Sequence, residues 1–192
     1  MAYLTESEVR DRASRVTQRM QKTAGRVLTE DRASNQDVFD IFLSHSSSEP
    51  EELLLGIKAL LEDIGLKVYV DKYSDPQLSP SNVTTQTAEI LRTRMRQSQT
   101  LLYVYSQHST KSRWMPWELG FFDGYKGRVG IVPVTRNQEE VFKGEEYLNL
   151  YPYVDRMSTK GGIDKLWINR TRDEYAPLYE WTKATEQIRA HS

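Results

Sequence analysis

At 192 residues, the chain is long enough for one α/β domain and short for two. Its net charge of −1 shows no basic excess, so we expect no nucleic-acid partner. It has no cysteines, and its three histidines lie far apart in the sequence, so we expect no disulfide and no metal site. No apolar run reaches the roughly 20 residues of a membrane-spanning helix, and the N-terminus does not resemble a secretion signal. These features predict a cytoplasmic protein that does not span a membrane.

Residues 6–29 have the spacing of one amphipathic helix. Apolar side chains recur every three or four positions, and Thr5 with Glu8 predicts a capping box at the start. The apolar stripe is narrow, so the helix must dock either on its own domain or on another subunit, and both alternatives stay open. We expect residues 1–36 to form this helix and a polar linker. Residues 37–192 are expected to form an α/β domain with a C-terminal helical extension.

From residue 37 the pattern alternates between strands and helices. Strands are expected at 38–43, 66–70, 101–105, 128–134 and 151–154, with 166–168 as a candidate for one more. Helices are expected at 51–64, opened by a Ser48/Glu51 capping pair and closed by Gly65, around Ala88–Met95, at 112–122 and at 175–188. Arg92, Arg94 and Arg96 are expected to spread around one helix and face solvent. This alternation predicts a parallel sheet with helices on both faces.

The stretch 112–122 places one carboxylate, Glu118, among aromatic side chains. Ser112 can cap a helix here, and Pro116 fits only in a first turn. Three rings at helical spacing share the face of Glu118, namely Trp114, Phe121 and Phe122. A carboxylate surrounded by aromatic side chains is suited to bind and cleave a substrate in which a flat, cationic ring is linked to a sugar. The alternative is a packing helix whose glutamate faces water.

Polar segments follow the ends of three predicted strands, at 44–48, 71–81 and 106–114. Ligands of parallel sheets bind beyond the carboxyl ends of the strands, so we expect these segments to meet at one rim with Glu118. The candidate substrate-binding residues are Ser44, His45, Ser46, Tyr73, Tyr105, Ser106 and Trp114. Alternatives stay open: His45 bonded to its own backbone, Tyr73 on the surface, and Trp114 packed in the core. Trp117 is expected to face the core, and Asp40 to make structural hydrogen bonds.

Three segments together resemble the TIR domain in its bacterial form. They are Asp40-Ile-Phe-Leu-Ser-His-Ser, the proline-containing loop after Val70, and Trp114-Met-Pro-Trp-Glu-Leu-Gly. The resemblance covers roughly residues 37–160 and leaves the N-terminal helix outside. It implies a flavodoxin-like five-stranded parallel sheet with helices on both faces. It also implies cleavage of NAD⁺ at the nicotinamide–ribose bond, with Glu118 as the catalytic residue and NAD⁺ as substrate rather than cofactor.

The resemblance further implies a setting for this activity. Bacterial TIR enzymes often act in antiphage defence, where they deplete NAD⁺ or make a cyclic ADP-ribose signal for an effector protein. A homo-oligomer is expected, because TIR active sites are often completed by a neighbour's loop. One departure concerns the loop that would hold the diphosphate: relatives often carry a basic residue there, where this chain has Ser47, Ser48 and Glu49. A non-catalytic TIR adaptor and a deoxyribosyltransferase-like enzyme of similar layout stay open as alternatives.

The chemistry of NAD⁺ suits a site with one carboxylate. Ordinary glycosidases use two, because the leaving oxygen must be protonated. Nicotinamide in NAD⁺ is already cationic and leaves as a neutral molecule, so one carboxylate that stabilises the growing positive charge on the ribose is sufficient. The surrounding rings are expected to desolvate Glu118 and raise its pKa. Attack by water gives ADP-ribose, and attack by an adenine nitrogen or a ribose hydroxyl gives a cyclic product; the sequence leaves this choice open.

Overall fold

The computed structural model describes residues 2–31, 37–75, 84–137, 145–158 and 164–190. Its helices are α1 (Glu6–Met20), α2 (Ala24–Glu30), α3 (Glu51–Asp63), α4 (Asp71–Ser74), α5 (Thr85–Gln97), α6 (Trp114–Lys126) and α7 (Leu178–Thr182), with 3-10 turns η1 (Ser109–Lys111) and η2 (Glu146–Leu150). Its strands are β1 (Leu4–Thr5), β2 (Phe39–Ser44), β3 (Val68–Tyr69), β4 (Ser98–Tyr105), β5 (Val129–Thr135), β6 (Tyr153–Ser158), β7 (Asp164–Asn169), β8 (Glu174–Pro177) and β9 (Arg189–Ala190). None of the helices in these ranges is both long enough and apolar enough to cross a membrane. Most of the expected linker at 31–36, and residues 76–81 of the expected loop, lie outside the described residues.

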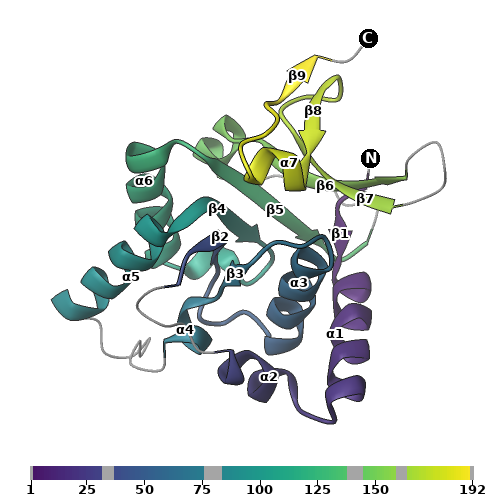
Figure 1. The fold of residues 1–192 in the computed structure, drawn as a ribbon, viewed down its shortest axis with the longest axis vertical. Coiled ribbons are helices and arrows are strands. Elements are labelled where there is room, and N and C mark those ends of the chain that lie inside the picture. The colour runs from purple at the N-terminus through teal and green to yellow at the C-terminus, as the bar shows by residue number, and fades with distance from the viewer. Residues whose placement is uncertain (1, 32–36, 76–83, 138–144, 159–163, 191–192) are drawn as a thin grey trace.

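One sheet runs through the molecule in the order β3-β2-β4-β5-β6-β7-β8-β9 (Figure 1). Its first five strands are parallel and have the flavodoxin-like order, which confirms the predicted α/β fold. The antiparallel strands β7, β8 and β9 extend this sheet beyond β6. The strand order reverses between β2 and β4, so the carboxyl ends of these two strands flank the place where such sheets bind ligands.

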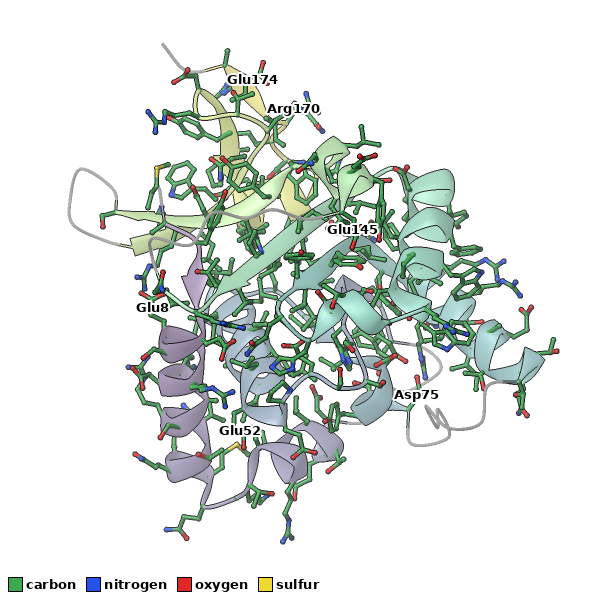
Figure 2. All side chains as sticks on the ribbon, turned by 180° about the vertical axis from the view of Figure 1, so that it is seen from behind. Glu8, Glu52, Asp75, Glu145, Arg170 and Glu174 are labelled. Atoms are coloured by element: carbon green, nitrogen blue, oxygen red, sulfur yellow. The ribbon has the colours of Figure 1, made fainter. Side chains whose placement is uncertain are left out.

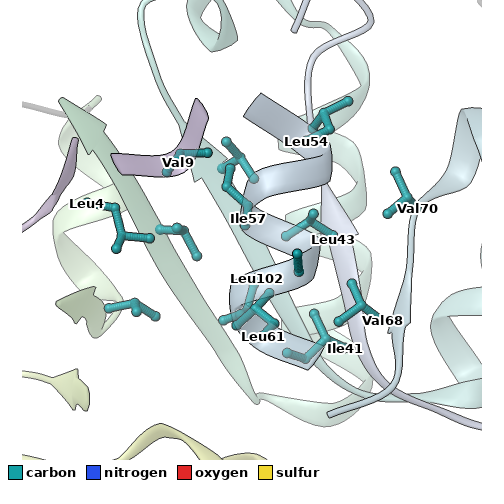
Figure 3. Close-up of a cluster of buried hydrophobic side chains, with 14 of the residues drawn as sticks. Leu4, Val9, Ile41, Leu43, Leu54, Ile57, Leu61, Val68, Val70 and Leu102 are labelled. Atoms are coloured by element: carbon teal, nitrogen blue, oxygen red, sulfur yellow. The ribbon is translucent and has the colours of Figure 1, made fainter. Parts of the chain in front are cut away.

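Helices pack on both faces of the sheet and create two buried clusters. Successive residues of a strand point to opposite faces, so in β4 Leu102 and Val104 join the cluster under α3, while Leu101 and Tyr103 join the cluster under α5 and α6. Figure 3 shows the first cluster, which extends from Leu4 of β1 through side chains of α3 to those of β2 and β3. Burial on both faces explains why the strands are apolar at almost every position.

The N-terminal segment forms two helices, so the single helix predicted for residues 6–29 is wrong. The predicted Thr5/Glu8 capping box is present, but Gln21 ends α1 in a left-handed conformation and Thr23 caps α2. This break lets Leu28 of α2 reach the buried cluster under α3, which one straight helix would not allow.

The N-terminal helices dock on their own chain, which was one of the two alternatives. Helices α1 and α3 lie side by side (Figure 1), and a Cβ atom on Gly56 of α3 would stand 2.0 Å from the carbonyl oxygen of Val9. Strand β1 pairs in parallel with the end of β5. The described residues 2–31 therefore share one hydrophobic core with the sheet.

The helix predicted at 175–188 is also wrong. Residues Glu174–Pro177 form β8, which pairs with β7, and only the short α7 follows before β9. Pro177 lacks an amide hydrogen and therefore begins α7 rather than continuing a longer helix. The open edge of β7 gives Tyr175 and Ala176 strand partners that local periodicity could not reveal.

Two smaller predictions also fail for identifiable reasons. Helix α3 begins after Pro50 without a side-chain cap, because the Ser48 hydroxyl bonds Ser46 and the carbonyl of His108 instead. Arg94 does not face solvent: its guanidinium donates to both carboxylate oxygens of Asp75 at 2.7 and 2.9 Å, and both side chains are buried. Figure 2 shows Asp75 at the end of α4, on the side of the molecule that carries α5. The ion pair fixes the chain directly after β3.

Candidate active site

Glu118 lies in the second turn of α6, where the helix packs beneath the carboxyl end of β2. Its side chain is only 2% exposed, and its Oε2 accepts a 2.5 Å hydrogen bond from Ser44 Oγ at the last position of β2. Pro116 stands in the first turn of α6, as predicted. The helix begins one residue later than a Ser112 cap would place it, with Arg113 as the N-cap residue, although the Ser112 hydroxyl accepts a hydrogen bond from the amide of Met115. Glu118 therefore points into the protein at the switch point and not to water.

The surroundings of Glu118 make it a weak acid. Burial, which is the largest effect, raises its pKa to about 8, and the nearby charge of Asp71 acts in the same direction. The hydrogen bond from Ser44 and the charge of His45 oppose this rise. Glu118 is therefore mostly protonated near neutral pH in the free protein, and a positive charge placed beside it favours the ionised form.

His45 is a buried ring held between a backbone carbonyl and a carboxylate. Its Nδ1 donates to the carbonyl of Ser46 at 2.9 Å, and its Nε2 lies 2.8 Å from Asp71 Oδ1. Burial alone would lower the pKa of His45, but Asp71 and the Ser46 carbonyl outweigh it, so the pKa is raised. The Nδ1 hydrogen bond to the Ser46 carbonyl favours the alternative in which His45 bonds its own loop. Nε2 lies within ion-pair distance of Asp71 but makes no hydrogen bond of good geometry with the described residues.

A hydrogen-bond network joins the loop after β2 to the loop after β4. The hydroxyls of Ser46 and Ser48 are 2.8 Å apart, and Ser48 donates to the carbonyl of His108 at 3.2 Å. Ser106 donates to the carboxylate of Glu49, whose Oε1 lies 2.8 Å from Ser106 Oγ. Glu49, one of the three residues 47–49 where the resemblance led us to expect a basic side chain, is thus buried and links the two loops, and burial raises its pKa.

The structure does not bring Tyr73 to the rim as an accessible ring. Tyr73 is 3% exposed, stacks on His45 with 6.5 Å between ring centroids, and donates to Glu51 through its hydroxyl. It supports His45 from the core side of the sheet, so it is neither the stacking platform nor the surface residue that the sequence suggested. Tyr105 is half-buried at the end of β4 and packs against the cluster under α6.

Trp114 belongs to a ladder of rings along α6. The Trp114 and Trp117 rings meet edge to face at 5.1 Å, and Trp117, Phe121 and Tyr125 stack on one another at about 6 Å. Arginines of α5 cover two of the rings, with Arg92 over Trp117 and Arg96 over Phe121. Trp114 and Trp117 are both half-buried, so Trp117 lies at the margin of the core rather than inside it.

Two residues near Glu118 were missed as individual site candidates. Asp71 is the first residue of α4, separated from the end of β3 only by Val70. Burial and the hydrogen bond with Tyr147 are the main causes that raise the pKa of Tyr103 in β4, and the charge of nearby Glu118 adds to them. An acidic residue immediately after a predicted strand was the available signal for Asp71. Asp40 makes the structural contacts expected of it, with the amide of Lys67 at 2.8 Å and with Lys183 at 2.7 Å.

The chain is similar to known proteins over most of its length. It is 37% identical to a protein of Bacillus cereus (strain MSX-D12) named "Probable 3' cyclic ADP-D-ribose synthase ThsB'", over 94% of this chain and 98% of that one. It is 31% identical to the Cytobacillus dafuensis protein named "Putative cyclic ADP-D-ribose synthase TIR2", over 45% of this chain and 23% of that one. Among solved structures it matches the TIR domain of the Toll-related receptor TRR-2 from Hydra magnipapillata with a TM-score of 0.45 and 19% identity, over 60% of this chain and 82% of that one.

The match to a protein family confirms the resemblance expected from the sequence motifs. The TIR domain family matches residues 41–166, which include the loop after β2 and the whole of α6 but leave out α1 and α2. The chain belongs to the TIR domain family.

Proposed function

We propose that this chain is an NAD⁺-consuming enzyme that breaks the nicotinamide–ribose bond and closes the ribosyl group into a cyclic ADP-ribose. The observation that carries the proposal is the buried Glu118 carboxyl at the switch point, held by Ser44 at 2.5 Å. The name of the Bacillus cereus relative, a 3' cyclic ADP-D-ribose synthase, supports the same reaction for a chain that aligns over nearly its full length.

The proposed reaction depends on the raised pKa of Glu118. The cationic nicotinamide ring of NAD⁺ favours the ionised carboxylate when it binds, although burial keeps Glu118 protonated in the free protein. As the bond to the ring nitrogen breaks, positive charge moves onto the ribose, and the carboxylate stabilises it in a poorly solvated site. Ser44 fixes the orientation of the carboxylate at the end of β2. Nicotinamide then leaves as a neutral molecule without a general acid.

The biological setting is part of the proposal. We propose a role in bacterial antiphage defence, with the cyclic nucleotide as a signal for an effector protein and with the chain working as a homo-oligomer. These points rest on the family resemblance. The candidate substrate-binding residues are proposed to position NAD⁺, either by direct contact or through the hydrogen bonds that join the loops after β2 and β4. They are Ser44, His45, Ser46, Tyr73, Tyr105, Ser106 and Trp114.

The test compares nicotinamide release from NAD⁺ by three proteins: the unaltered chain, Glu118→Gln, and the control Glu52→Gln. Glu52 is an exposed glutamate at the start of α3 and serves as the matched control. We expect Glu118→Gln to lose activity by about 100-fold or more, as when an enzyme loses its main electrostatic stabiliser, and Glu52→Gln to keep it. Assays over a range of protein concentrations allow for assembly. Equal release by Glu118→Gln and the unaltered chain would refute the proposal.

A further inference from the structure

We propose that Asp71 is a second catalytic carboxylate, the general base that removes the proton from the ribose hydroxyl that closes the cyclic product. The inference rests on the proposed function and adds a residue to it. It begins from a juxtaposition in the structure: the end of β3 and the end of β2 are adjacent in the sheet, and each carries one residue of an Asp71–His45 pair beside Glu118.

The buried His45 ring holds Asp71 in position. His45 Nε2 lies 2.8 Å from Asp71 Oδ1, and the other ring nitrogen is held by the Ser46 carbonyl at 2.9 Å. Tyr73 packs against the His45 ring and is itself held through its hydroxyl by Glu51. The imidazole therefore acts as a rigid support for the carboxylate.

Asp71 is also the more accessible of the two acids. Its side chain is 24% exposed, whereas Glu118 is 2% exposed. The charge of Asp71 is nevertheless felt at Glu118, where it acts with burial to raise the pKa of the glutamate. The two carboxyl groups therefore interact electrostatically, and Glu118 is the buried member of the pair and Asp71 the partly exposed one.

Cyclisation through a hydroxyl needs a proton acceptor, whereas loss of nicotinamide does not. The 3' position named for the Bacillus cereus relative carries a hydroxyl group in a ribose, so we take a hydroxyl as the nucleophile. Among the described groups that interact with Glu118, the Ser44 hydroxyl donates to the glutamate. The raised pKa of His45 keeps its ring protonated beside Asp71, and burial keeps the Tyr103 phenol protonated. Glu118 must stay ionised while the ribose is positive. Asp71 is left as the acceptor.

The step balances without any further reactant. The bond between the ribose carbon and the nicotinamide nitrogen breaks, and its electron pair stays on the nitrogen, which becomes neutral. The hydroxyl oxygen forms the new bond to that carbon, and its proton passes to the Asp71 carboxylate. The protonated Asp71 then returns the proton to solvent. The net change is NAD⁺ to nicotinamide, a cyclic ADP-ribose and one proton.

The experiment measures products of NAD⁺ turnover by Asp71→Asn, with Asp173→Asn as a control. Asp173 is an exposed aspartate in the turn between β7 and β8, so its variant removes one surface charge far along the chain from the site. We expect Asp71→Asn to keep releasing nicotinamide but to give a cyclic-to-linear product ratio lowered by at least about tenfold, since a general base is worth about 100-fold or more. Asp173→Asn should keep the ratio of the unaltered chain.

A second nucleophile separates base catalysis from a structural role. 3-Acetylpyridine attacks through a nitrogen that carries no proton, so its exchange for nicotinamide needs no general base. Asp71→Asn should therefore keep base exchange while losing cyclisation, which a misfolded variant could not do. Asp71→Glu should recover part of the cyclic product.

Each outcome decides the proposal. An unchanged product ratio in Asp71→Asn overturns it, as does an equal loss of cyclisation and base exchange. An unaltered chain that makes only linear ADP-ribose overturns it together with the cyclisation in the proposed function, while cleavage of NAD⁺ still stands. An unaltered chain that releases no nicotinamide refutes the proposed function itself.

Discussion

The pH dependence of nicotinamide release is the property that most directly reports the environment of Glu118. Because burial raises the pKa of Glu118 to about 8, only the ionised fraction of the free enzyme is ready to react. That fraction is about one-tenth at pH 7 and about one-hundredth at pH 6. We therefore expect kcat/KM to rise about tenfold per pH unit from pH 6 to near 8 and then to level off.

The variant Ser44→Ala sharpens this prediction. The Ser44 hydroxyl donates to Glu118 and lowers its pKa, so loss of the hydroxyl should move the rise in kcat/KM to higher pH. The assay follows nicotinamide by chromatography in buffers of constant ionic strength from pH 5 to 10. A rise centred near the ordinary glutamate value of 4.5, or a profile that is flat between pH 6 and 8, would show that the pKa of Glu118 is not raised as predicted.

Three changes test the stability of the fold. The native state keeps the Glu118 proton up to about pH 8 whereas the unfolded chain releases it near 4.5, so stability falls as pH rises through this window. Glu118→Gln should therefore raise the free energy of unfolding at pH 9, by a few kcal/mol, and change it little at pH 4. Gly56→Ala should cost about 3 kcal/mol, because the new methyl group meets a backbone oxygen of α1, whereas Gly120→Ala, which meets nothing within 4 Å, should not destabilise. Asp75→Asn should cost about 3–5 kcal/mol, since it leaves Arg94 buried without its carboxylate. Chemical denaturation measures all three, and a destabilised Glu118→Gln at pH 9, a tolerated Gly56→Ala or a neutral Asp75→Asn would each contradict its own prediction.

The central part of the fold was predictable because each of its strands and helices has a recognisable pattern of apolar residues within its own segment. Strands buried on both faces are apolar along their length, and helices between them show their own period, so the five parallel strands follow from pattern alone. The rule that carboxyl ends of parallel strands meet at one edge predicted that the segment beginning at Ser44 would lie near Glu118, but the hydrogen bond between the two side chains was not predicted.

The failures share a different cause, which is dependence on partners far away in sequence. Residues 174–177 become a strand because β7 offers an open edge, and Arg94 is buried because Asp75 lies across from α5. The contact between His45 and Asp71 likewise joins two segments that lie far apart in the sequence. The pattern of strands predicted that both segments lie at the carboxyl edge of the sheet, but it could not predict that these two side chains contact each other. Tyr73 shows the same limit: its place after β3 was predicted, but its burial behind His45 depends on packing.

The most direct test of this account is a mass-spectrometric balance of the NAD⁺ reaction with and without Glu118→Gln. The unaltered chain is expected to release one nicotinamide for each NAD⁺ consumed and to give a cyclic nucleotide that is lighter than ADP-ribose by one water. Both signals are expected to be lost in the variant. Undiminished nicotinamide release by Glu118→Gln, or NAD⁺ left intact by the unaltered chain at every protein concentration, would contradict this expectation.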